Sequence, residues 1–431
     1  MTGRTNSEDS KKPISILVIG GSYGGIAVLN QLGKLLKEKE AKTETGEQSG
    51  TAAPDAAAKV VITLVEPKNG FLNVIGIPRC MVSVDFASTQ YVDYESFKNF
   101  KFDKVISSDA ETAKIVAGSS SDSSKSGNKR YVLQWIQAKV TKLEESYAEY
   151  QMEFSSEKEV INFDYAIIAS GRDRTYPVAP KARSKKEFAD EMQSFVDSFK
   201  DKDIISIVGA GAVGIELSSE IKLHFPEKQV NLIHPHGTLP PEPLSDDFKS
   251  KVIASLKKAR INLSLNTRIA SEADGVLTTT DGRQIRSDFT FWTNSKNNNL
   301  AFLGDKIRKS YLSPSGNLYV NKFFQLSYND QTLPNIMSIG DVVELPIIKT
   351  AGWAMYMGSL VSQNIIELLS GNEVSKAMIA SEDIPKGMLL VGGNADIISQ
   401  NQGKIEVNNK EFVELYKTYW VDRIVYSYNN A

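Results

Sequence analysis

Two glycine-rich turns limit what this chain can fold into. The first lies in VIGGSYGG (residues 18–25) and the second in VGAGAVG (residues 208–214). Each turn follows a short apolar run typical of a buried parallel strand and precedes a run with helical spacing. A strand, a glycine turn and a helix in this order form the phosphate-binding unit of a dinucleotide domain. We therefore predict an α/β chain with two Rossmann-like domains that hold two dinucleotides.

The second turn satisfies the full G-x-G-x-x-G pattern with Gly209, Gly211 and Gly214. Gly209 permits the tight turn, Gly211 lets the backbone approach a pyrophosphate, and Gly214 lets the helix pack on the strand. The helix N-terminus then attracts the phosphate charge. We predict dinucleotide binding here, the alternative being a turn that has lost its ligand.

The first turn departs from the pattern, because Ser22 stands between the first glycine, Gly20, and the last, Gly25. Serine is small enough for close approach, and its hydroxyl can donate to a phosphate. Glu66 ends the next apolar run and is suited to accept ribose hydroxyls, although a solvated strand-end charge is the alternative. The predicted cofactor-binding turn comprises Gly20, Gly21, Ser22, Tyr23, Gly24 and Gly25.

A third segment, IGDV (residues 339–342), supports a flavin. Gly340 and Asp341 end an apolar run, where a carboxylate can accept a hydroxyl from a polyol chain. Lys349 follows and opens a predicted helix over residues 350–370. A helix N-terminus and an ammonium group would stabilise the negative charge that reduction places on a flavin ring. A surface lysine is the alternative. Trp353 and Tyr356 could stack on a quinone, but their spacing is more typical of a core.

His234 ends the strand at which an acidic residue normally selects NAD, and no Asp, Glu or arginine pair stands there. This histidine could contact the adenine or the ribose, or be an ordinary loop residue. The choice between NADH and NADPH stays open.

The predicted organisation follows from where these motifs stand. We predict a disordered N-terminus (1–12), an FAD-binding domain in two parts (13–172 and 297–372), an NAD(P)H-binding domain (173–296) and a small C-terminal α+β element (373–431). Polar composition predicts disordered loops at 37–59 and 118–130. Residues 104–161, including 131–136, are expected to form a small antiparallel element. Aromatic residues within 411–428 are expected to dock on the chain itself or on a second subunit rather than on a membrane.

Composition excludes several classes of site. Cys80 is the only cysteine, so neither an internal disulfide nor a thiolate metal site can form, and with three histidines no metal is predicted. The net charge of −2 gives no sign of a nucleic-acid partner. No run approaches the ~18 apolar residues of a membrane span, and residues 1–12 show neither a signal core nor a myristoylation glycine. We expect a cytoplasmic monomer or homodimer, with peripheral contact with mitochondria or lipid droplets left open.

Seven segments together resemble the apoptosis-inducing-factor-like branch of the two-dinucleotide flavoprotein reductases, which includes ferroptosis suppressor proteins and fungal relatives. These segments are GGSYGG, LVEPKNGF, IPRC, FDYAIIASG, GAGAVGIE, IGD and KTAGWAMYMGSLVSQNI. The resemblance implies FAD in the first domain and NADH or NADPH in the second. It implies hydride transfer from NAD(P)H to FAD, and then electron transfer to a quinone or another small-molecule acceptor.

The resemblance also implies roles for individual residues. FAD contacts would be the first turn, Arg79, the Val140 backbone, Gly171, Gly340 and Asp341, with Glu66 on the adenosine ribose. Lys349 would lie beside the isoalloxazine and Glu216 near the nicotinamide. Asn294 stands where the family usually has a glycine. The alternative is therefore an FAD-binding regulatory protein with weak or no NAD(P)H turnover.

Overall fold

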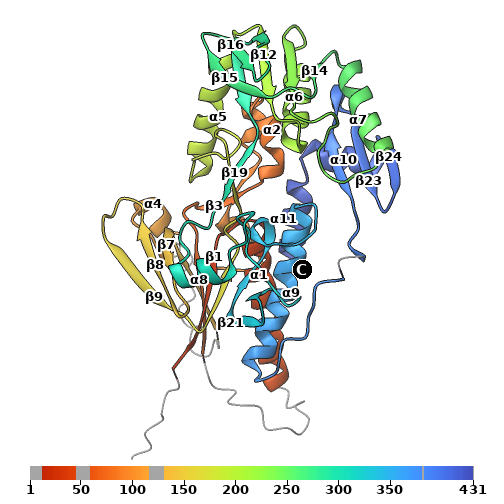
Figure 1. Ribbon diagram of the computed structural model, residues 1–431. Coiled ribbons are helices and arrows are strands. Elements are labelled where there is room, and N and C mark those ends of the chain that lie inside the picture. Colours follow the sequence, from red (N-terminus) through yellow and green to blue (C-terminus); the bar gives the residue numbers. More distant parts are fainter. Residues whose placement is uncertain (1–11, 45–58, 116–130, 381–382, 431) are drawn as a thin grey trace, which may run out of the picture.

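The computed structural model describes residues 12–44, 59–115, 131–380 and 383–430. The predicted loop at 118–130 lies outside these residues, as do most of the predicted N-terminal segment and residues 45–58 of the first loop. Figure 1 shows two α/β bodies, one above the other, with a smaller C-terminal element beside the upper one.

The lower body is built on a sheet of seven strands, which are parallel except for the edge pair β20–β21. Its helices α1 (Tyr23–Glu44) and α9 (Ala351–Leu369) lie side by side. Across the sheet, the strands are β20 (Gln325–Tyr328), β21 (Gln331–Ser338), β10 (Tyr165–Ile168), β1 (Ile14–Ile19), β2 (Val60–Val65), β6 (Tyr131–Ile136) and β5 (Lys104–Ile106).

Two sequence-based expectations for this body were wrong in part. The run 131–136 is strand β6, which pairs in parallel with β2, and is not part of an antiparallel element. The antiparallel element itself exists as β7 (Ala138–Leu143), β8 (Tyr147–Met152) and β9 (Lys158–Asn162). Helix α1 continues to Glu44, so the first eight residues of the loop predicted at 37–59 are helical.

Short elements connect β2 to β5, and the helices among them pack on the upper body. They are β3 (Gly70–Leu72), α2 (Ile77–Cys80), α3 (Val84–Ala87) and β4 (Tyr91–Asp93), and α4 (Ala110–Ala113) follows β5. Helix α8 (Asp305–Tyr311) precedes β20. The central strands are buried on both faces, which explains their continuous apolar sequences.

The upper body has a parallel sheet in the order β14-β13-β12-β18. These strands are β14 (Asn262–Ser264), β13 (Gln229–Ile233), β12 (Ile204–Val208) and β18 (Phe289–Trp292). Its helices are α5 (Lys185–Phe199), α6 (Ala212–His224) and α7 (Asp246–Lys258). A three-stranded antiparallel sheet joins β15 (Ile269–Ala273), β16 (Val276–Thr279) and β17 (Gln284–Arg286).

Two segments that connect the bodies run beside each other. Strand β11 (Arg172–Arg174) enters the upper body, and β19 (Ser295–Asn298) leaves it; the two pair in antiparallel fashion. The domain boundaries predicted at 172 and 296 fall within this ladder and stay predictions.

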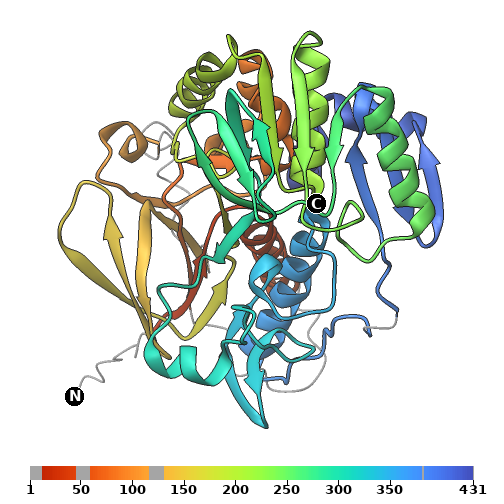
Figure 2. The same ribbon diagram turned by 45° about the horizontal axis from the view of Figure 1, so that its top comes forward.

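The sheet of the C-terminal element packs on α6 and α7 of the upper body (Figures 1 and 2), whereas the last helix of this element packs on α1 of the lower body. It consists of β22 (Met388–Val391), β23 (Ile397–Asn401), β24 (Lys404–Val407), α10 (Lys410–Lys417) and α11 (Val421–Asn430). Positive φ angles at Tyr419 and Trp420 separate the two helices. Among the described residues, no helix has both the length and the apolar character needed to cross a membrane.

Candidate functional site

The two glycine turns have the same backbone geometry. Gly20 and Gly209 begin them with φ angles of 101° and 116°, which favour glycine. A Cβ atom on Gly25 would lie 1.8 Å from the Gly20 carbonyl oxygen, and one on Gly214 would lie 1.8 Å from that of Gly209. Each final glycine therefore lets a helix begin directly against its strand, as a dinucleotide turn requires.

In both domains, the residue after the second strand reaches back to the turn. Glu66 follows β2, and its Oε2 accepts a hydrogen bond from the Gly21 amide at 2.7 Å. His234 follows β13, and its Nδ1 accepts from the Ala210 amide at 3.1 Å. The structure thus brings both predicted ribose-side residues to their turns.

Gly211 provides the most open approach to a helix N-terminus. It is the N-cap of α6, and a Cβ atom there would meet nothing within 4 Å. The first amides of a helix have no partner within the helix. The backbone around Gly211 can therefore meet a phosphate group without obstruction, as the sequence predicts.

The first turn is more enclosed than the second. A Cβ atom on Gly21 would lie 2.1 Å from the hydroxyl of Tyr94, which donates to the Gly21 carbonyl at 2.7 Å. Ser22 is half-buried beside the buried Tyr23 at the start of α1. Tyr94 had no signal in the sequence, because it stands in a short connecting segment far along the chain.

Asp341 and Lys349 come together at the N-terminus of α9, together with two arginines that the sequence did not single out. Arg174 Nη2 lies 3.9 Å from Asp341 Oδ2, and Arg172 acts electrostatically on Lys349. Burial and the charge of Arg172 lower the pKa of Lys349 to about 8, although the charges of Asp341 and Glu344 oppose this shift. Three basic groups therefore stand with two carboxylates, Asp341 and Glu344, so the cluster offers both donors and acceptors to a polar ligand.

The neighbouring backbone supports this cluster. Lys349 Nζ donates to the Val343 carbonyl oxygen, and Thr350 caps α9 by accepting from the Trp353 amide at 3.3 Å. Gly340 has a φ of 79°, and its amide points to Met357 Sδ on α9 at 3.3 Å. The helix N-terminus and the ammonium group are therefore held in one region, as predicted.

Gly171 and Val140 lie at other edges of the same body. Gly171 follows β10 with a φ of 68° and open space where a Cβ atom would be. Val140 on β7 is buried and belongs to the same core cluster as Ile19 and Val65, the last residues of β1 and β2. Their assignment to FAD stays a prediction.

Arg79 makes its contacts with the upper body and the C-terminal element. Its Nη2 forms an ion pair with Glu220 Oε1 at 3.0 Å. The guanidinium carbon lies 5.0 Å from the centroid of the Phe86 ring and 4.7 Å from that of Tyr419. Its role as an FAD contact stays a prediction that these contacts do not support.

Glu216 is buried between α6 and the C-terminal sheet. Its Oε1 accepts from the Val391 amide at 3.1 Å. Burial and the nearby Glu220 charge raise the pKa of Glu216 to about 8, against the opposing effect of the hydrogen bond from Val391. The role near a nicotinamide stays a prediction, because this contact joins Glu216 to β22.

Asn294 lies between β18 and β19. Asn294 is exposed, and its backbone, unlike that of Asn266, does not lie in the left-handed region. This position therefore does not need a glycine for its backbone conformation.

Trp353 is half-buried against the core and Tyr356 is 37% exposed, so only Tyr356 offers much free ring surface.

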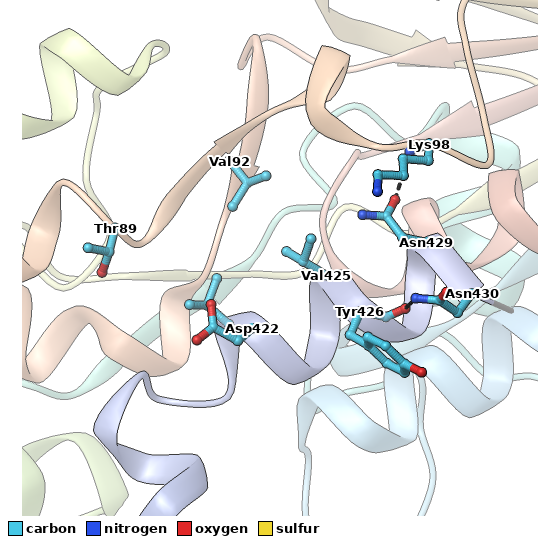
Figure 3. Close-up of a pocket in the computed structure, with 9 residues that line it drawn as sticks. Thr89, Val92, Lys98, Asp422, Val425, Tyr426, Asn429 and Asn430 are labelled. Atoms are coloured by element: carbon cyan, nitrogen blue, oxygen red, sulfur yellow. Dashed lines mark hydrogen bonds between the residues drawn. The ribbon is translucent and has the colours of Figure 1, made fainter.

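A cavity of about 500 Å³ lies between the β4 region and α11 (Figure 3). Its labelled lining residues mix polar and apolar groups, and the Lys98 amide donates to Asn429 Oδ1 across it at 2.7 Å. None of the predicted site residues lines this cavity. It therefore has no part in the nucleotide sites.

Comparison with known proteins agrees with this geometry. The family described as pyridine nucleotide-disulphide oxidoreductase matches residues 14–358. The oxidoreductase OXR1 of Ajellomyces capsulatus is 26% identical over 96% of this chain and 87% of its own. Ferroptosis suppressor protein 1 of Homo sapiens is 23% identical over 82% and 80%, respectively. The sulfide:quinone oxidoreductase of Aquifex aeolicus superposes with a TM-score of 0.64 at 14% identity, covering 97% of this chain and 92% of its own.

Proposed function

Because the chain belongs to the pyridine nucleotide-disulphide oxidoreductase family and uses FAD and NAD(P)H, we propose that it passes electrons from NAD(P)H through FAD to a quinone. The observation that carries this proposal is the pair of matching turns, one in each body, each with a strand-end side chain bonded to it. The bound flavin would supply the redox chemistry by accepting a hydride and releasing electrons to the acceptor.

The cysteine count argues against a disulfide as the acceptor. Cys80 is the only cysteine in the sequence, and burial raises the pKa of its thiol far above the usual range. A redox-active dithiol needs two cysteines and a reactive thiolate. The proposal of a quinone is supported by the name of the Aquifex relative, which shares the fold.

The chain's own residues would position and polarise the two dinucleotides. The first-turn amides of α1 and α6 would hold the pyrophosphates, and Glu66 would hold the adenosine ribose of FAD. Lys349 and the N-terminus of α9 would lie beside the flavin ring, where they stabilise negative charge on it. Hydride transfer needs no separate acid or base, which agrees with the absence of a recognisable catalytic motif from the sequence.

Anaerobic titration of the purified FAD-loaded protein with NADH and then NADPH, monitored by the visible flavin spectrum, tests the proposal. We expect either nucleotide to bleach the flavin and a short-chain quinone to restore its colour. A flavin that stays oxidised would overturn the reductase and favour the regulatory flavoprotein. A reduced flavin that the quinone leaves bleached would overturn the acceptor alone.

Gly211→Asp provides the matched variant, because the space around Gly211 is open and its φ of −74° suits any residue. The added carboxylate would repel a pyrophosphate. Bleaching should slow at least tenfold, and Gly211→Ala, which adds a methyl group but no charge where the pyrophosphate approaches, should slow it less. Gly214 is less suitable, because a side chain there would strike the Gly209 carbonyl and disturb the fold.

A further inference from the structure

His234 occupies the place in the second turn that Glu66 occupies in the first. Each side chain accepts a hydrogen bond from the amide of the residue that follows the first glycine, at 3.1 Å for His234 and 2.7 Å for Glu66. A carboxylate at this place accepts the hydroxyls of an unphosphorylated ribose and disfavours a 2′-phosphate. An imidazole in place of this carboxylate changes which ribose substituents the second site can bind.

The hydrogen bond to Ala210 fixes the tautomer of His234. Because Nδ1 accepts a hydrogen bond, the hydrogen of the neutral ring must be on Nε2. Nε2 is buried and has no hydrogen-bond partner among the described residues, and the whole residue is only 5% exposed. A buried donor without a partner is unfavourable. Because Nε2 is buried, a ligand oxygen beside the turn would satisfy it once the side chains around it move.

The surroundings of His234 keep its ring neutral, so that it offers a hydrogen-bond donor and no charge. His236 is exposed, and its ring centroid lies 5.1 Å from that of His234. Burial and this second ring lower the pKa of His234 to about 4, and no carboxylate contributes. Among the described residues, no carboxylate shifts the pKa of His234, so none lies close enough to repel phosphate oxygens strongly.

We propose that His234 donates a hydrogen bond from Nε2 to the 2′-substituent of the adenosine ribose, and that the second site prefers NADPH to NADH. A phosphate offers several strong acceptor oxygens, whereas a 2′-hydroxyl offers one weaker acceptor. The inference rests on the proposed function, because it assigns the nucleotide substrate of the same site.

Binding of the adenosine halves of the two nucleotides tests this preference without any redox step. Isothermal titration calorimetry of the FAD-loaded protein should show 2′,5′-ADP binding at least tenfold more tightly than 5′-AMP. His234→Glu, which recreates the arrangement at Glu66, should reverse this ratio. His234→Gln keeps an acceptor for Ala210 and a donor, so it should preserve the preference. His224→Gln, on α6, is the histidine control and should change nothing.

Equal or tighter binding of 5′-AMP by the unmodified protein would overturn the inference, as would an unchanged ratio in His234→Glu. Stopped-flow flavin reduction separates this result from the proposed function. If neither nucleotide reduces the flavin but 2′,5′-ADP still binds preferentially, the proposed reductase activity is refuted and the inference about His234 stands. If NADH reduces the flavin fast and NADPH reduces it poorly, the inferred NADPH preference is refuted and the proposed reductase activity stands.

Discussion

At the residue scale, Lys349 is the charged group whose removal should most affect flavin reduction. Its side chain is half-buried before the N-terminus of α9, where Asp341 and Arg172 act on its charge. Lys349→Ala should retain FAD but slow its reduction by NAD(P)H at least tenfold, which corresponds to about 1.4 kcal/mol in the activation barrier. Stopped-flow absorbance measures both properties. Because the pKa of Lys349 is lowered to about 8, the rate in the unmodified protein should fall as pH rises through 8. A rate unchanged by either test would remove Lys349 from the site.

Glu216 allows a second prediction at this scale, concerning stability. Its pKa of about 8 lies well above the ordinary value of 4.5, so between these values the folded chain holds a proton that the unfolded chain has lost. Stability should therefore decrease as pH rises from about 4.5 to 8 and then level off. Glu216→Gln keeps an oxygen for the Val391 amide and should reduce this dependence, as measured by the melting temperature. If the variant also loses NAD(P)H turnover while remaining folded, the role near the nicotinamide gains support.

At the element scale, the contact between α1 and α9 links the first glycine turn to the helix that carries Lys349. A Cβ atom on Gly358 would lie 2.8 Å from the Gly24 carbonyl oxygen and 3.0 Å from Ala27 Cβ. Gly358→Val should therefore destabilise the protein by about 1–3 kcal/mol through overpacking and weaken FAD binding. Gly33→Ala, in α1, is the control, because its nearest neighbour would be the Tyr131 hydroxyl at an ordinary 3.8 Å. Urea denaturation should show a neutral or stabilising effect for the control. A harmless Gly358→Val would mean that the helices can separate.

The elements also show what the sequence could and could not predict. The two turns were predictable because their glycines, strands and helices are adjacent in sequence. Helix α5 is not among the elements predicted from the sequence, although Ser184 accepts from the Glu187 amide in a recognisable capping pattern. The pairing of 131–136 with β2 was not predictable, because alternating apolar residues do not identify a distant parallel partner.

At the scale of the whole molecule, Arg79 joins three parts of the chain that are far apart in sequence. It lies on α2 in the connection between β2 and β5, pairs with Glu220 on α6 and stacks against Tyr419 of the C-terminal element. Its guanidinium also donates to the carbonyl oxygens of Tyr416 and Lys417. The resemblance that includes the motif IPRC implied a cofactor contact for Arg79. Its partners Glu220 and Tyr419 could not be predicted, because no local pattern reveals partners more than a hundred residues away.

Removing Arg79 should therefore loosen the assembly of the three parts. Arg79→Ala leaves Glu220, whose side chain is 0% exposed, without its ion-pair partner, which typically costs about 3–5 kcal/mol. Arg79→Met combined with Glu220→Gln removes both charges and should recover part of this loss. Arg283→Ala breaks an ion pair whose side chains are 59% and 58% exposed and should have no measurable effect on urea denaturation. If Arg79→Ala instead releases FAD while its unfolding curve stays unchanged, the arginine binds the cofactor and the sequence-based assignment was right.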